Sequence, residues 1–195
     1  MVAVHSVYMT PRTIFFIGKP GCGKGTQARL LSEHTGWPII GAGAQFRQIA
    51  AEETPAGERT KRDIDQGLLM PHWFAMYLYL KGLFSLPGNA SVIFDGFNRK
   101  LAEAELIVAS LTWLERPFDV VHIAVSDEEV RRRLEGRKSE GRADDHSVDT
   151  RLTEYETYTT KAISLFETHG VLKTVNGEQP PEAIAKDVLA VLNLA

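Results

Sequence analysis

The most informative residues of this sequence form a glycine-rich loop, residues 18–26, that reads GKPGCGKGT. The loop follows a short apolar run and leads into a segment with helical composition. Glycines allow the backbone to curl so that successive N–H groups point at phosphate oxygens, and the new helix adds partial positive charge. Lys24 can then reach the β- and γ-phosphates of a nucleotide. The candidate phosphate-binding residues are Gly21, Cys22, Gly23, Lys24, Gly25 and Thr26.

A second chemical group stands at the end of another apolar run, residues 91–94, where Asp95 follows directly. A carboxylate at a strand end can hold a magnesium ion close to a phosphate-binding loop. Asp95 is therefore a candidate metal ligand.

The order of lysine, glycine and threonine in residues 24–26 resembles the adenylate kinase family, whose loops read GxPGxGKGT. Further segments resemble the family's DGFPR, STGDLLR and GxLVP patterns: residues 93–99 (IFDGFNR), 41–47 (GAGAQFR) and 67–71 (GLLMP). The resemblance runs from about residue 13 to the C-terminus. It implies that Asp95 and Thr26 hold Mg²⁺ in the site, and that Arg47 and Arg99 bind the phosphate of an acceptor nucleotide.

The resemblance also implies an acceptor site between the second and third strands. In the family, the backbone of the GxLVP segment lines the acceptor base. The implied substrate-binding residues are Ala42, Arg47, Leu68, Leu69, Met70, Gly96, Arg99 and Glu103.

Residues 133–137 (RLEGR) and 141–145 (GRADD), with Arg151 after them, resemble the family's lid. A lid brings arginines to the migrating phosphoryl group while it excludes water. It is of the short kind that lacks four metal-binding residues, so we expect no zinc. The implied catalytic residues are Lys24, Arg99, Arg137, Arg142 and Arg151. The implied further contacts with ATP are Arg133, Arg137 and Gln179.

Three departures from the family pattern fall in the acceptor site: Ala42 replaces a threonine, Asn98 a proline, and Glu103 the glutamine that reads adenine. An ionised carboxylate cannot match both the acceptor and the donor of adenine, whereas guanine offers two donors. One hypothesis is that Glu103 selects such a base. The alternatives are that Glu103 points to solvent or is protonated, and that backbone atoms near Met70 read adenine.

The elements that must position these residues alternate between strands and helices. Short apolar runs predict five strands, at residues 13–17, 38–40, 91–94, 120–125 and 171–175. Helical spacing occurs between them, for example at residues 152–166. The alternation predicts an α/β three-layer P-loop fold, with a five-stranded parallel sheet and helices on both faces. Ligands are then expected at the carboxyl ends of the strands.

The length of 195 residues predicts a single domain. The expected core comprises residues 12–41, 85–137 and 148–195, with an acceptor-nucleotide lobe at about 42–84 and a lid at about 138–147.

Composition narrows the class of protein further. A formal charge of −3 argues against a nucleic-acid or membrane partner, and the single cysteine argues against a disulfide scaffold. We expect a cytoplasmic monomer. The six histidines show no metal-ligand spacing and are interpreted as structural.

Together these features predict a nucleoside monophosphate kinase that uses ATP and Mg²⁺, with AMP as the leading acceptor. One alternative is another acceptor, such as GMP, CMP or UMP. A second is a regulatory or assembly protein that binds nucleotides with weak or no turnover.

Overall fold

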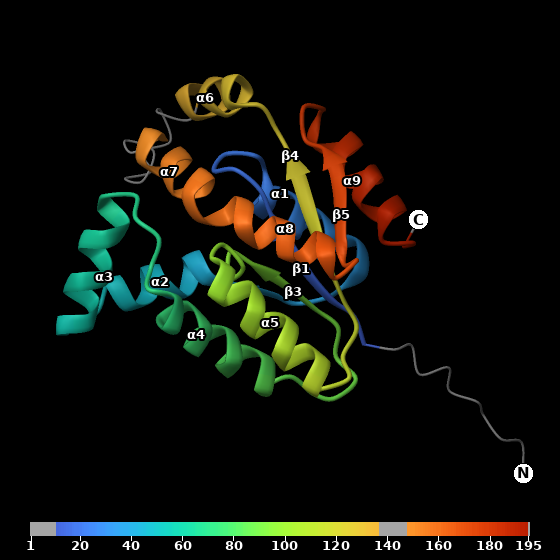
Figure 1. The fold of residues 1–195 in the computed structure, drawn as a ribbon, viewed down its shortest axis with the longest axis horizontal. Helices are drawn as coiled ribbons and strands as arrows, with labels where there is room; N and C mark the ends of the chain where they lie inside the picture. Colours follow the sequence, from blue (N-terminus) through green and yellow to red (C-terminus); the bar gives the residue numbers. More distant parts are fainter. Residues whose placement is uncertain (1–10, 137–147, 195) are drawn as a thin grey trace, which may run out of the picture.

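The computed structural model describes residues 11–136 and 148–194. It contains a five-stranded, fully parallel sheet in the order β2-β3-β1-β4-β5 (Figure 1). The strands are β1 (Thr13–Ile17), β2 (Ile39–Gly41), β3 (Val92–Asp95), β4 (Phe118–Ala124) and β5 (Leu172–Asn176). The predicted fold class is confirmed, and each strand lies within two residues of its predicted position.

Helices connect successive strands and cover the sheet (Figure 1). They are α1 (Lys24–Thr35), α2 (Ala42–Ala50), α3 (Pro55–Asp65), α4 (His72–Phe84), α5 (Leu101–Trp113), α6 (Asp127–Gly136), α7 (Val148–Glu154), α8 (Thr160–Thr168) and α9 (Pro181–Val191). A π-helical turn, η3 (Tyr155–Thr159), joins α7 to α8 without a break.

The central strand β1 explains why the fold has three layers. All five of its residues are buried, and alternate side chains enter two separate hydrophobic cores. Phe15 and Ile17 pack with α4, α5 and α8, whereas Ile14 and Phe16 pack with α1 and α9. Because side chains alternate across a strand, one apolar run can supply both cores.

The segment between β2 and β3 is described throughout and contains three helices and no strand. Helix α3 begins at a conventional cap, in which Thr54 Oγ1 accepts a hydrogen bond of 3.0 Å from the N–H of Gly57. Helix α2 packs against both α3 and α4, so this segment stands beside the carboxyl ends of β2 and β3 (Figure 1).

Two catalytic candidates, Arg137 and Arg142, lie outside the described residues, as does the predicted lid at 138–147. Within the described part of the chain, no helix has the length and apolar character needed to cross a membrane.

Gly57 generates a prediction about the packing of α3. A methyl group added there would overlap the carbonyl oxygen of Glu52 and lie 2.7 Å from that of Ile49. Because both atoms belong to the backbone, Gly57→Ala should lower the free energy of unfolding by about 1–3 kcal/mol in urea titrations. Gly88→Ala is the control, since no described atom lies within 4 Å of its added carbon. Equal free energies of unfolding for the two variants would contradict the close packing of Gly57 against these two carbonyl oxygens.

Candidate active site

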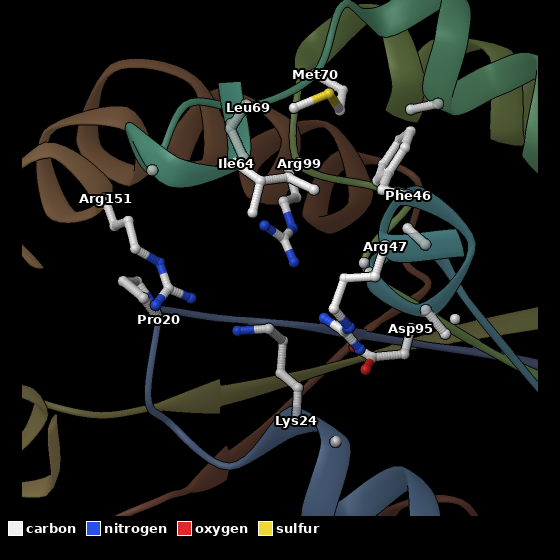
Figure 2. Close-up of a pocket in the computed structure, with 18 of the residues that line it drawn as sticks. Pro20, Lys24, Phe46, Arg47, Ile64, Leu69, Met70, Asp95, Arg99 and Arg151 are labelled. Atoms are coloured by element: carbon white, nitrogen blue, oxygen red, sulfur yellow. The ribbon is translucent and has the colours of Figure 1, made fainter. Parts of the chain in front are cut away.

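A cavity with a volume of about 1080 Å³ lies at the carboxyl ends of β1, β2 and β3. The glycine-rich loop and the start of α1 form one wall. Helix α2, the segment before α4 and the start of α5 form the other walls. This is the position at which parallel α/β sheets bind ligands, and Figure 2 shows the side chains that line it.

The loop has the backbone conformation that a phosphate-binding site needs. Gly21 and Gly23 have φ angles of 75° and 101°, in the left-handed region that favours glycine. Among the described residues, no atom lies within 4 Å of a side-chain carbon built on Gly23, so the space beside it is open to a ligand. The turn therefore leaves room for phosphate at the start of α1.

Lys24 holds the loop together. Its ammonium group donates hydrogen bonds of 2.7 Å and 2.8 Å to the carbonyl oxygens of Gly18 and Lys19. Burial lowers the pKa of Lys24, an effect that Cys22 opposes and Arg99 reinforces. A bound phosphate would offset the cost of burial, because a nearby anion favours the charged amine.

Three arginines join Lys24 around the cavity. The side chains of Arg47, Arg99 and Arg151 all point into it, from α2, the loop after β3 and α7 (Figure 2). Planar guanidinium groups suit the binding of phosphate oxygens. These four cationic side chains, from four segments, thus surround a space that can take a polyphosphate.

Asp95 supplies a carboxylate in the same cavity. Its Oδ2 atom lies 3.7 Å from the position of a side-chain carbon built on Gly25, directly before Thr26. Carboxylate and hydroxyl oxygens are ligands that Mg²⁺ accepts when substrate phosphates and water complete its shell. The two residues named from the sequence are therefore compatible with a magnesium ion.

All eight substrate-binding candidates line this one cavity. They come from three separate segments of the chain: residues 42–47, residues 68–70 and residues 96–103. The structure therefore brings together the whole acceptor side that the sequence predicts.

Other predicted ATP contacts have different surroundings. The guanidinium group of Arg133 donates to Glu129 at 2.6 Å, to the Cys22 carbonyl at 3.3 Å and to the Gly177 carbonyl at 2.7 Å. Cys22 is fully buried, and the Gln179 amide donates to the Asn176 carbonyl. Arg133 thus links the phosphate loop to the segment after β5 and lies outside the lining of the cavity.

Glu103 is the departure with the clearest structural role. Its side chain is 3% exposed, so the solvent-pointing alternative is wrong. One oxygen, Oε2, accepts hydrogen bonds from the N–H groups of Arg99 at 2.7 Å and Lys100 at 2.9 Å, which caps α5. Burial raises the pKa of Glu103 to about 7, although these backbone bonds oppose the shift.

Among the three departures from the family pattern, Asn98 is the one whose side chain lacks hydrogen-bond partners. It is fully buried, and neither its amide nitrogen nor its amide oxygen has a hydrogen-bond partner among the described residues. A buried polar group without a partner costs about 1–3 kcal/mol. The structure offers no contact that explains this residue.

Sequence reasoning missed two residues beside the acceptor wall. Lys100 contacts the carbonyls of Leu69 and Met70, and Glu154 contacts the N–H of Leu69. The partners are separated by 30 to 85 positions in the sequence, so no local sequence pattern predicts these contacts.

Comparison with known proteins agrees with this geometry. A model of the adenylate kinase family matches residues 16–171. The chain is 36% identical over 187 residues to the adenylate kinase of Thermus thermophilus, covering 94% of this chain and 98% of the relative. It is 37% identical over 187 residues to the adenylate kinase of a Synechococcus strain, covering 93% and 96%. The adenylate kinase of Thermobifida fusca is 31% identical over 183 residues, covering 92% and 97%.

The family model spans most of the chain, and the relatives match it over almost their whole length. The segments that resemble the family in sequence, although far apart along the chain, meet around one cavity. This chain, a phosphotransferase, therefore belongs to the adenylate kinase family.

Proposed function

We propose that this chain transfers the γ-phosphoryl group of Mg²⁺-bound ATP to the phosphate of AMP, giving two molecules of ADP. The observation that supports this most is the cavity that joins the Lys24 loop to all eight acceptor-side candidates. Its volume of about 1080 Å³ lies at the upper end of the ~300–1,000 Å³ of a typical small-molecule site.

In the proposed reaction, an oxygen of the acceptor phosphate attacks the γ-phosphorus of ATP. The bond from that phosphorus to the β–γ bridging oxygen breaks, and its electron pair remains on the departing ADP. No side-chain nucleophile is needed, so the protein's task is to align the two phosphates and neutralise their charge.

The cationic residues divide this task. Lys24 and Arg151 neutralise the migrating group and the bridging oxygen, and Arg47 and Arg99 hold the acceptor phosphate. Arg137, directly before the proposed lid at about 138–147, and Arg142, within it, add positive charge around the migrating group, and the lid excludes water. The acceptor lobe is assigned to residues at about 42–84, and the protein is proposed to act as a cytoplasmic monomer.

Mg²⁺ would be held by Asp95 and Thr26 together with substrate phosphates and water, and when bound it neutralises charge on the β- and γ-phosphates. Asp95 also holds negative charge beside Lys24, which favours the protonated form of that amine.

The buried carboxylate of Glu103 supports GMP as a second acceptor. Oε2 already accepts from the N–H groups of Arg99 and Lys100, so Oε1 is the oxygen that can meet a base. When protonated, Oε1 donates to a base acceptor such as N1 of adenine, and when ionised it accepts from a base donor such as N1–H of guanine. With a pKa of about 7, both forms are populated near neutral pH.

Lys24→Met should lower the rate of phosphoryl transfer from Mg·ATP by about 10²-fold or more, because the ammonium group at the transferred phosphate is lost. The measurement is the steady-state rate with AMP, GMP, CMP and UMP. AMP should be the best acceptor of the wild-type protein. Lys186→Met, in an exposed position on α9, should retain the wild-type rate. Transfer to none of the four monophosphates would refute the proposed function.

Asp95→Asn should raise the Mg²⁺ concentration needed for half-maximal rate by about tenfold or more, because a neutral amide is a weaker ligand for a hard cation. The rate is measured while Mg²⁺ is varied at fixed ATP. Asp65→Asn, at an exposed position in α3, is the matched control and should follow the wild-type curve. An unchanged Mg²⁺ dependence in Asp95→Asn would exclude this carboxylate from the metal site.

Glu103→Gln should stabilise the protein at high pH. Below pH 4.5 both the folded and unfolded carboxyls are protonated, so Glu103 makes no difference. As the pH rises to about 7, the unfolded carboxyl ionises while the folded one keeps its proton, and the free energy of unfolding falls by about 3 kcal/mol. The glutamine side chain of the variant does not titrate, so the variant should exceed the wild type at pH 8 and match it at pH 4 in urea titrations.

Exposed Glu105→Gln, two positions along the same helix, is the control for this comparison and should show no such gap. In the wild type, the ratio of AMP to GMP activity should fall between pH 6 and pH 8, and in Glu103→Gln it should stay constant. A ratio that falls equally in both proteins would remove Glu103 from base recognition.

A further inference from the structure

The acceptor wall of the cavity includes a short stretch of chain without regular structure, residues 67–70, which we call the Leu69 segment. It connects α3 to α4, and its first two N–H groups, of Gly67 and Leu68, donate to carbonyls at the end of α3. Among the described residues, the N–H of Leu69 and the carbonyls of Leu69 and Met70 have no backbone partner, so their hydrogen bonds come from distant side chains. Glu154 Oε2 accepts a hydrogen bond of 3.3 Å from the N–H of Leu69. The ammonium group of Lys100 donates to the carbonyls of Met70 at 3.0 Å and Leu69 at 3.4 Å.

Lys100 is also attached, through its backbone, to the opposite wall of the same cavity. It is the N-cap residue of α5, it follows Arg99 directly, and its own N–H donates to Glu103. Arg99 and Glu103 both line the cavity. One residue therefore connects the backbone that carries Arg99 and Glu103 to the backbone that carries Leu69 and Met70.

The ammonium group has a third partner that restricts its position. It lies 5.2 Å from the centroid of the Tyr158 ring, in η3, which is a favourable cation–π distance. Lys100 is half-buried, so its alternatives in water are reduced. Two carbonyl oxygens and a ring face thus hold one charge at the junction of three segments.

We propose that Lys100 is a positioning residue for the acceptor nucleotide, an inference that rests on the proposed function. By joining the Leu69 segment to the start of α5, it fixes the separation of the two walls before the acceptor binds. Preorganisation of this kind increases affinity because less chain must be ordered on binding. Lys100 lies outside the lining of the cavity, so its effect is exerted through Leu69 and Met70.

The test compares Lys100→Met, Lys100→Arg and the wild type. Methionine keeps an unbranched apolar side chain but removes the charge, whereas arginine can still donate to the two carbonyls. In Lys100→Met, the KM for AMP, and its Kd by calorimetry, should rise about tenfold, the scale of one hydrogen bond to a charged group. The kcat and the KM for ATP should change less than about twofold, because the donor side is untouched. Lys100→Arg should recover most of the affinity, and exposed Lys81→Met is the matched control.

A second measurement does not need turnover. Without nucleotide, the amide hydrogen of Leu69 should exchange with deuterium about tenfold faster in Lys100→Met than in the wild type, because the segment opens more often. Unchanged exchange would overturn the inference even if the protein proved to use another acceptor. An unchanged Kd for AMP, or equal losses for AMP and ATP, would also overturn it. Failure of the proposed function would appear separately, as a wild type that transfers phosphate to no monophosphate.

Discussion

Like charge held around a single cavity is the constraint on which the rest of this structure depends. Lys24, Arg47, Arg99 and Arg151 face one another, and Asp95 places a carboxylate beside the loop that carries Lys24. In the absence of an anion these cations repel, and the carbonyls of the loop offset part of that cost at Lys24. A rigid scaffold must oppose the remainder, and the buried central strand, packed on both faces, provides it.

The sequence contained most of the fold and the parts of the site that depend on local pattern. A continuous apolar run predicts β1, and the glycines of residues 18–26 predict the turn after it, because both signals lie within a few neighbouring residues. The role of Glu103 was harder to predict. Its carboxylate caps α5 as well as lining the acceptor wall, and only the folded backbone shows both partners. Contacts such as Glu154 with Leu69 join residues 85 positions apart, which no spacing rule connects.

Buried polar groups on the acceptor side lower the stability of the folded protein. Glu103 is a carboxyl in an environment that favours its neutral form, and Asn98 buries an amide without partners among the residues that the structure describes. Apolar residues of similar size would pack there without desolvation cost. Natural proteins keep such groups most often where function demands them, so the carboxyl of Glu103, which lines the cavity, is better explained by what the cavity binds than by folding.

The π-helical turn η3 gives the active site a dependence on helix register. Such a turn holds one more residue than an α-helical turn, so it offsets the faces of the helical segments on its two sides. On one side, Ala162 and Phe166 are fixed in the core, while on the other Arg151 points into the cavity (Figure 2). The direction of Arg151 therefore depends partly on the number of residues between it and the core residues of α8. Loss of a single residue from η3 would turn Arg151 by about 100° about the helix axis, with every core contact of α8 still intact.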